Sequence, residues 1–542
     1  MIPPFDHISL PFLALYAETH FRFFRFFPSY QYARQPEIIF DAPRRLDPSQ
    51  DLPVVLIVND CRRFPVELVD CAIAVSRPRS TARRFDFTDL LQFEISHPLQ
   101  KSMRAFVFPL PRNELSTGVI DITCTVTAVA GRRREVVVND NFRTTAKKPF
   151  TCYVSDERLP GSRRCSYGDL HVHSHYSQSH VEFGPPLAVI GRVASASGLS
   201  FTAITDHSYD LACRMDDYLA ADPNHERWQS FMQELSALNQ SPPFLIPGEE
   251  ISCLNEKNRV VHLCGLDLHD YLPGTLDGAR RGRRKDPQST LTETIRAIHD
   301  QGGVAFAAHP GIRPGFLQRL FLYRGKWSNN DLENRLDALQ IFNNGFSPSF
   351  HRGKMMWLAL LRHGRRIPLT AGNDAHGDFN RFRALTIPFL AISENSGRYM
   401  GFGRTGIYGP PTSHDAIISG IRNGVTFITT GPYAEIGLLS RQPAFAGSNA
   451  PPRNNAEPCI RAMSTSEFGP LRNITVYGLQ RESGRETIVY SAHYTKSPSI
   501  WEAEFPIPLP AAPLSYLRAE VACVADGRGE TKAYTSPFFL ES

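Results

Sequence analysis

Hydrophobic and polar positions change their pattern twice along the 542 residues of the chain. In the first part they alternate with a period of two, most clearly in IDITCTVT at residues 120–127. Successive side chains of a strand point to opposite faces of a sheet, so this alternation predicts half-buried strands. The AGRRR turn at residues 130–134, between two such runs, predicts a hairpin. We therefore expect residues 1–165 to form a β-sandwich-like domain.

In the middle of the chain, short apolar runs alternate with stretches of helical periodicity. One such stretch is STLTETIRAIHDQGG at residues 289–303, where Ser289 is the expected N-cap and Gly302 the expected stop. Strands that alternate with helices are typical of βα units around a parallel sheet or barrel, which we expect over residues 166–433. The period of two returns afterwards, so residues 434–542 are expected to form a smaller β domain.

Composition and charge narrow the class of protein. An apolar content of 42%, a charged content of 21% and a net charge of +5 are typical of a globular chain. Arg-rich stretches at residues 132–134 and 281–285 are more typical of solvated loops than of a nucleic-acid surface, so no nucleic-acid partner is expected. No apolar run reaches the roughly 18 residues of a membrane span. The ten cysteines form no CxxC pair and the start lacks a signal-peptide pattern, which predicts a cytoplasmic protein, with homo-oligomerisation left open.

Residue types that bind metals follow nearly every apolar run of the middle region. His171 and His173 end the first run two positions apart, which places both imidazoles on one face of a strand. Thirteen of the 18 histidines fall between His171 and His376. Functional side chains of a parallel barrel gather at the carboxyl ends of its strands, so these run ends are expected to share one centre. The later runs end in Asp206 and His207, Glu249 and Glu250, His262, His309, Asn344, and residues 373–376.

A set of imidazoles and carboxylates without thiolates suits zinc, manganese or iron. Two neighbouring ions lower the pKa of a shared water and clamp the charge on an attacked phosphoryl or carbonyl group, so hydrolysis is the expected chemistry. A single TDH or AHP would more often be an ordinary capped turn, but several such elements in succession favour a metal centre. His175 and His180 stay open between ligand and loop. The histidines expected at the surface are His225, His269, His299, His351 and His363.

Six motifs resemble, in order and spacing, those of the polymerase and histidinol phosphatase (PHP) superfamily. They are DLHVHSHYS, AITDH, IPGEEIS, VVHLCGL, GGVAFAAHPG and TAGNDAH, between residues 169 and 376. The stretches GRTGIYG and ISGIRNGVTFITTGP that follow resemble the carbaryl-hydrolase-like (CehA/McbA) branch. The resemblance implies a multidomain α/β protein, with a distorted (βα)7 barrel flanked by the N-terminal β-sandwich and the small C-terminal β domain.

The resemblance also implies a role for single residues. The HxH pair that binds the first metal falls on His171 and His173, and the carboxylate that completes this site and orients the attacking hydroxide falls on Asp374. The glutamate that bridges two metals follows the glycine of the PGxE motif by two positions. It therefore falls on Glu250 rather than on Glu249.

The second metal's ligands fall on His262 and His309. His207 and His376 match residues that hold a third metal or otherwise contact the substrate and assist the leaving group. Members with three metals carry a further histidine where this chain has Ser179, which favours two divalent ions over three. The metal is expected to be manganese, zinc or iron.

The substrate stays open among several classes. The superfamily resemblance implies a phosphoesterase first, and Arg381, Arg383 or Arg404 could receive the anion of a small-molecule ester. The branch resemblance implies a carbamate or amide hydrolase as the alternative. A non-catalytic binding module with metals as structural staples is a third interpretation, and nucleic-acid processing is a fourth that the modest charge disfavours. Gln340 stands where many relatives carry a glutamate, which removes a negative charge near the expected site.

Overall fold

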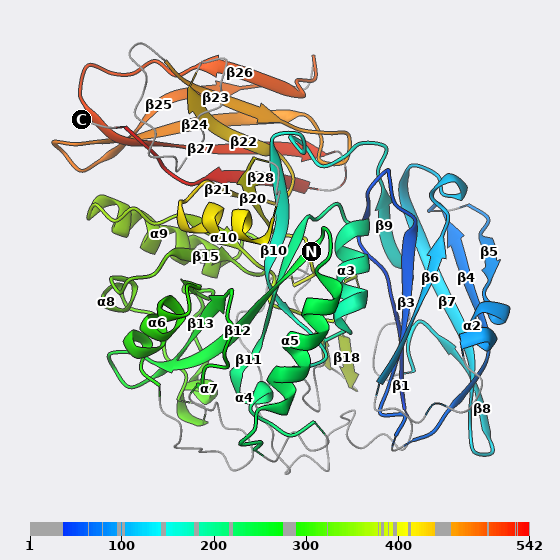
Figure 1. The fold of residues 1–542 in the computed structure, drawn as a ribbon. Helices are drawn as coiled ribbons and strands as arrows, with labels where there is room; N and C mark the ends of the chain where they lie inside the picture. Colours follow the sequence, from blue (N-terminus) through cyan, green and yellow to red (C-terminus); the bar gives the residue numbers. More distant parts are fainter. Residues whose placement is uncertain are drawn as a thin grey trace.

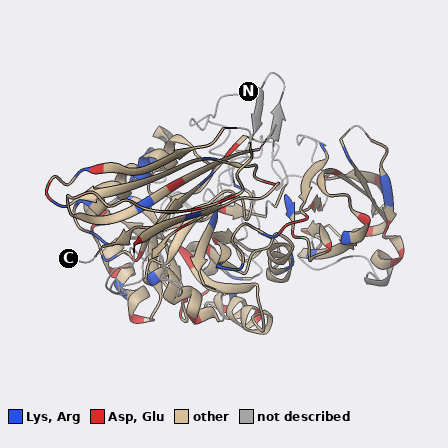
Figure 2. Ribbon diagram, turned by 90° about the horizontal axis from the view of Figure 1, so that it is seen from above, with Lys and Arg blue, Asp and Glu red and all other residues tan. Residues whose placement is uncertain are grey.

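The computed structural model gives the position of most of the chain. It describes residues 36–62, 64–78, 80–94, 99, 103–141, 148–177, 184–215, 221–274, 289–321, 323–377, 379–380, 384–387, 390–393, 398–409, 413–438, 457–495, 498–525, 527 and 529–540. Within this part, 44% of residues lie in strands and 18% in helices. The Arg-rich stretch at 281–285 lies outside the described residues. Figure 2 shows basic and acidic residues interspersed along the described elements.

The N-terminal part consists of two sheets that pack around a core of their own. The first sheet has the antiparallel order β1 (Glu37–Asp41), β3 (Leu52–Asn59), β6 (Met103–Leu110). The second has the order β2 (Arg45–Leu46), β9 (Phe150–Val154), β7 (Gly118–Ala130), β4 (Glu67–Ser76), β5 (Arg83–Asp86), with β8 (Arg133–Val138) also on β7. The short helices α2 (Thr88–Glu94) and η2 (Arg112–Glu114) connect strands.

The hairpin predicted at residues 130–134 is confirmed, because β7 and β8 pair antiparallel across this turn. Gly131 has a φ of 61°, a left-handed conformation that glycine adopts without strain. Ile120, Ile122 and Cys124 are at most 1% exposed, while the intervening side chains are partly exposed. The period of two therefore identified the buried face of β7.

The middle of the chain supplies one end of a long mixed sheet. Its strands are hydrogen-bonded in chain order, and β17 pairs back with β10. They are β10 (Cys165–His173), β11 (Phe201–His207), β12 (Phe244–Leu254), β13 (Val260–Leu266), β14 (Val304–Ala307), β15 (Ala338–Phe342), β16 (Leu369–Ala371) and β17 (Ala375–His376). The helices of this region are α3 (Leu187–Ala196), α4 (Ser208–Leu211), α5 (Glu226–Leu238), α6 (Leu291–Asp300), α7 (Phe316–Phe321), α8 (Asn329–Leu332), α9 (Pro348–Arg362) and α10 (His414–Arg422).

The expected (βα)7 barrel was wrong. The described part is mostly β, with nine helices and large mixed sheets. Strand β13 runs antiparallel to both β12 and β14. Between β12 and β13 the chain reverses in a tight turn, where the Asn255 side-chain oxygen accepts hydrogen bonds from the N–H groups of Lys257 and Arg259. Antiparallel strands need no crossover helix, and apolar runs alone do not reveal strand direction.

The long sheet continues beyond β10 into the C-terminal strands, which lie above the middle region in Figure 1. The order is β10, β20 (Arg404–Tyr408), β21 (Thr426–Thr429), β28 (Gly529–Thr535), β27 (Leu514–Ala525), β24 (Leu471–Gln480), β25 (Glu486–His493), with β29 (Phe538–Phe539) on β27. A smaller sheet contains β22 (Tyr433–Leu438), β23 (Pro458–Met463) and β26 (Glu502–Pro506), and β18 (Ala384–Ile387) pairs with β19 (Leu390–Ser393). Hydrogen bonds between β21 and β28 thus join the C-terminal strands to the middle region.

Helix α6 begins one residue later than expected. Its N-cap is Thr290, whose side chain and that of Glu293 form a reciprocal capping box, whereas the hydroxyl of Ser289 donates to the Pro273 carbonyl. Gly302 follows the helix with a φ of 80°, as expected of a helix stop. No described helix combines the length and the apolar character needed to cross a bilayer. The ten cysteines are buried and form no disulfide within the described part of the chain.

Candidate metal centre

The structure brings all eight sequence-predicted ligands together. Their nitrogen and oxygen atoms form three overlapping groups, within each of which all atoms lie within 4.8 Å of one another. Seven of the eight are buried, and His309 is partly exposed. The groups are His171, His173, Glu250 and Asp374; Glu250, His262 and His309; and His173, His207 and His376.

Strand register explains this convergence. His171 and His173 alternate with Val172 on β10, so both imidazoles leave the same face. His207, the last residue of β11, is in register with Glu250 on the parallel strand β12. His376 on β17 is in register with His173. Backbone pairing therefore places ligands from distant parts of the chain side by side.

The first group has the spacing of ligands around a single ion. The Nε2 atom of His173 lies 3.2 Å from His171 Nε2 and 3.3 Å from Asp374 Oδ1. The Nε2 atom of His171 lies 3.6 Å from Glu250 Oε2 and 3.7 Å from Asp374 Oδ1. Ligands at about 2.1 Å from a tetrahedral ion stand about 3.4 Å apart. These four side chains could therefore hold one ion with little rearrangement.

The ligand atoms of the second group lie closer together than those of the first. Glu250 Oε1 lies 2.5 Å from His262 Nδ1 and 3.0 Å from His309 Nε2. The shorter distance is below that of an ordinary N–H···O hydrogen bond, and two ligands of one ion would stand further apart. The guanidinium of Arg324 also contacts this group, with Nη2 3.4 Å from His262 Nδ1. An ion here would replace the contact between His262 and Glu250.

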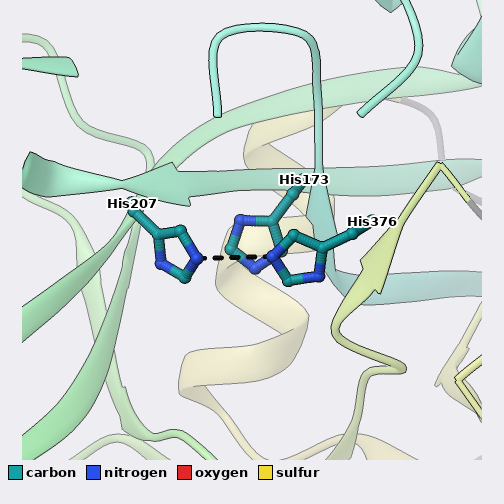
Figure 3. A group of neighbouring side chains, drawn as sticks. All are labelled: His173, His207 and His376. Atoms are coloured by element: carbon teal, nitrogen blue, oxygen red, sulfur yellow. Dashed lines mark hydrogen bonds between the residues drawn. The ribbon is translucent and has the colours of Figure 1, made fainter. Parts of the chain in front are cut away.

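The third group consists of three imidazoles that face one another (Figure 3). The Nε2 atoms of His207 and His376 are 3.3 Å apart, and the rings of His173 and His376 stack with their centroids 3.9 Å apart. The three imidazole nitrogens of this group could hold a metal ion.

Hydrogen bonds to Nδ1, the ring nitrogen on the side away from the neighbouring ligands, orient three imidazoles of the centre. His171 Nδ1 lies 2.9 Å from Gln340 Oε1. His173 Nδ1 lies 3.2 Å from Ser177 Oγ, and His376 Nδ1 lies 3.1 Å from the Asp374 carbonyl oxygen. The amide and backbone carbonyl oxygens can only accept, so they favour a proton on Nδ1 of His171 and His376 and leave Nε2 available for a metal, whereas the Ser177 hydroxyl can donate or accept. Gln340, which stands where many members of the resembled family carry a glutamate, therefore orients His171 through a neutral amide oxygen.

Burial and neighbouring charges shift the pKa values of the ligands in different directions. Burial alone would raise the pKa of Glu250, but His262 and His171 hold it well below its usual range. Asp374 behaves in the same way, because Arg398, whose Nη1 lies 3.2 Å from Oδ2, lowers its pKa. Burial, reinforced by His207, lowers the pKa of His173 to about 3. Anionic carboxylates and neutral imidazoles are the forms that bind divalent ions. Against the effect of burial, Cys264 and Glu250 raise the pKa of His171 well above its usual range, and Glu250 raises the pKa of His207, so an ion would compete with protons at these two imidazoles.

Two buried atoms of the centre lack a hydrogen-bond partner within the described part of the chain: Glu250 Oε2 and His207 Nδ1. They are 3.0 Å apart, but not in hydrogen-bond geometry. Buried polar atoms are nearly always satisfied, so these two orphans fit a centre that completes itself with a cation. The residues present therefore fit divalent metal ions.

Backbone strain also marks the centre. Asp374 and His309 have φ values of 53° and 36°, in the left-handed region that side chains other than glycine rarely adopt. The Asp374 N–H donates to the His171 carbonyl at 2.8 Å, which ties its loop to β10. The buried carboxylate of Asp169 accepts hydrogen bonds from the Asn373 and Gly401 N–H groups and thereby holds two loops at the site. Such conformations persist only where the surrounding structure enforces them.

A cavity of about 70 Å³ opens beside the three groups. Arg324, Arg398 and Gln318 line it together with apolar residues such as Val261 and Trp327. Neither arginine was predicted from the sequence, because neither follows a strand and no spacing links them to the ligands. By volume the cavity admits a few waters or a compact polar group.

Arg404, one of the three arginines proposed from the sequence, lies elsewhere. Arg404 is 5% exposed on β20, with its guanidinium 5.4 Å from the centre of the Phe468 ring, and it does not line the cavity. Arg381 and Arg383 lie outside the described residues, as do Ser179 and His180. The expectation for Arg404 was therefore wrong, because its strand directs the side chain toward the C-terminal strands.

Within the described part of the chain, the other histidines do not join the ligand groups. His175 Nε2 lies 3.8 Å from Glu234 Oε2, which identifies it as a loop residue. His269, His351 and His363 are exposed, and His225 and His299 are partly exposed, in broad agreement with the expectation of surface positions. Glu249 is equally excluded, since its Oε1 accepts the Leu272 N–H at 2.9 Å on the other face of β12.

The fold and the site together define a β-rich protein with a buried imidazole and carboxylate centre that could bind metal ions. No protein-family model matches the chain, and no curated protein is similar to it.

Proposed function

We propose that the protein is a metal-dependent hydrolase that cleaves a phosphate ester. The observation that carries this proposal is the position of two arginines beside the ligand groups. Arg398 contacts Asp374 of the first group and Arg324 contacts His262 of the second, and both line the cavity. One guanidinium group can bind two oxygens of a phosphate at once, whereas a neutral carbamate carries no negative charge for two cations to bind. The motif order that resembles the PHP superfamily supports the same reaction class.

The first ion would be held by His171, His173, Glu250 and Asp374, and a second by Glu250, His262 and His309. Bound divalent ions supply a hydroxide at neutral pH and neutralise charge on the reacting phosphoryl group. The chain's own groups then act around them.

Three contributions come from side chains that line the cavity. The Asp374 carboxylate orients the attacking water as a hydrogen-bond acceptor, with its other oxygen held by Arg398. Arg324 and Arg398 bind the non-bridging oxygens of the phosphate. His207 and His376 lie where they can protonate the leaving oxygen or hold a third ion.

A paired hydrolysis assay tests the proposal. The protein, loaded with manganese or zinc, is given p-nitrophenyl phosphate and, separately, p-nitrophenyl N-methylcarbamate. Release of nitrophenol from the phosphate alone supports the phosphoesterase, and release from the carbamate alone replaces it with a carbamate hydrolase. Ions bound tightly with neither substrate cleaved would instead favour the metal-stabilised binding module.

A matched pair of variants separates the arginines from general charge effects. Arg324→Met is expected to raise the KM for the phosphate ester, because it removes a cation from the cavity. Arg296→Met serves as the control, since this side chain is exposed on α6 and pairs only with Asp300 among the ion pairs of the described residues. An equal KM in both variants would remove Arg324 from the substrate site.

A further inference from the structure

A segment of the N-terminal sandwich reaches loops that carry ligands of the candidate metal centre. The segment is residues 41–45, which connects β1 to β2. In Figure 1 the sandwich lies beside the middle region, on the side of α3. Its contacts with the centre come from Asp41 and Arg44.

Asp41 holds the chain just after His376. Its side chain is buried, and its Oδ2 and Oδ1 accept hydrogen bonds from the N–H groups of Phe379 at 2.9 Å and Asn380 at 3.0 Å. These residues follow His376 by three and four positions. A carboxylate that accepts backbone N–H groups makes stronger hydrogen bonds than a neutral acceptor would. Asp41 therefore fixes the exit of the chain from β17.

The sandwich holds the same loop at a second point. The Asn380 side chain donates to the Thr151 carbonyl of β9 at 2.8 Å, and Phe379 is 1% exposed. On the other side, β17 is a two-residue strand that pairs with β10 only through Ala375 and His376. So short a pairing leaves the direction of the loop to be set by its contacts with the sandwich.

Arg44 reaches the second loop. Its guanidinium stands 4.3 Å from the centre of the Tyr399 ring, a cation–π distance. Tyr399 is next to Arg398, whose Nη1 lies 3.2 Å from Asp374 Oδ2. The two sandwich side chains thus act on the two loops that frame Asp374.

We propose that Asp41 is a positioning residue of the metal centre, through which the N-terminal sandwich places His376 against His173 and His207. The N–H groups of Phe379 and Asn380 donate two charge-assisted hydrogen bonds to the Asp41 carboxylate, which hold these two residues in place. Holding them keeps the nearby His376 with its Nε2 3.3 Å from His207 Nε2. Removal of Asp41 would release the loop and widen the three-histidine group. The inference rests on the proposed function only for its turnover readout.

The test compares Asp41→Ala with Asn141→Ala in the full chain. Asn141 accepts the Ile38 N–H and donates to the Pro36 carbonyl, so its loss also removes two side-chain hydrogen bonds from the β1 region, away from the 376–380 loop. Each variant is titrated with Co²⁺, whose visible absorption reports ligand number and geometry. Bound ions are counted, and kcat and KM are measured on p-nitrophenyl phosphate.

For Asp41→Ala we expect an altered cobalt spectrum, weaker binding of the last ion, and a kcat lowered by about ten- to a hundredfold with little change in KM, the scale of a ligand misplaced by about 1 Å. Asn141→Ala should keep the wild-type spectrum, even if its melting temperature falls as far. A wild-type spectrum for Asp41→Ala, or an equal change in both variants, would overturn the proposal.

A conservative variant covers the case in which Asp41→Ala does not fold. Asp41→Asn keeps the size of the side chain and one acceptor oxygen, so its cobalt spectrum and ion affinity should fall between wild type and the alanine variant. Identity with wild type would overturn the positioning role. If the wild-type protein cleaves no phosphate ester, the proposed function fails on its own, and the cobalt spectra still decide the role of Asp41.

Discussion

Replacing Glu250 with glutamine tests the metal centre most directly, because this side chain belongs to two of the three ligand groups. Its Oε2 lies 3.6 Å from His171 Nε2, and its Oε1 lies 3.0 Å from His309 Nε2. Glutamine keeps the size of the side chain but removes the negative charge that compensates a divalent ion in a buried site. Loss of a residue that only supports a ligand typically lowers ion affinity by about 10- to 100-fold. Because Glu250 itself belongs to two ligand groups, we expect a fall of about 100-fold or more.

The effect on unfolding has a size that can be worked out. An ion present at about 100 times its dissociation constant stabilises the folded state by about 2.7 kcal/mol. If the affinity falls about 100-fold, the same concentration only equals the dissociation constant, and the stabilisation drops to about 0.4 kcal/mol. The metal-dependent part of the free energy of unfolding should therefore fall by about 2.3 kcal/mol. Urea unfolding with and without zinc or manganese measures it.

Glu249→Gln is the matched control. Glu249 is adjacent, equally buried and of the same size, but its Oε1 accepts the Leu272 N–H instead of facing the ligands. Burial raises the pKa of Glu249 well above its usual range, so burial already favours the neutral form that glutamine mimics. This variant should bind ions like the wild type. A Glu250→Gln protein that also binds them with unchanged affinity and number would refute the bridging assignment.

Three further changes have defined outcomes. Arg398 holds the pKa of Asp374 low, so in Arg398→Ala this carboxylate should take up its proton at a higher pH. Ion binding should then be lost at a higher pH than in the wild type, and an unchanged pH midpoint in ion titrations would contradict this. Gly372→Ala places a Cβ 2.4 Å from His171 Cβ, so the backbone must shift and the bound ion count measured by elemental analysis should drop. Thr290→Ala removes the N-cap of α6 and should lower the free energy of unfolding in urea by about 1 kcal/mol, with ion binding unchanged.

Local patterns of hydrophobic and polar residues predicted part of the fold. The alternation at residues 120–127 predicted a strand with one buried face, and the structure has it in β7. Helical periodicity predicted α6, with an error of one residue at the N-cap, because two adjacent hydroxyl side chains compete there and only the Thr290 side chain closes a box with Glu293. These features depend on residues within a few positions of one another, so they are visible in the sequence.

The ligand types were visible for a similar reason. A parallel strand that ends in a histidine presents that side chain at the edge where the other carboxyl ends lie, as His173 and His207 do on β10 and β11. His262 reaches the same edge for a different reason: it lies near the start of β13, and because β13 is antiparallel, that start lies beside Glu250. The metal type and the substrate depend on details that spacing does not encode.

The sequence by itself determined which residue types face the centre and which faces of the strands are buried, because side-chain direction along a strand or a helix is a local property. Only the tertiary structure decided the direction of β13, the entry of Arg324 and Arg398 into the cavity, and the hydrogen bonds from Asp41 to a loop 338 positions away. The physical reason is that strand pairing and loop contacts join segments whose separation along the chain leaves no periodic signal.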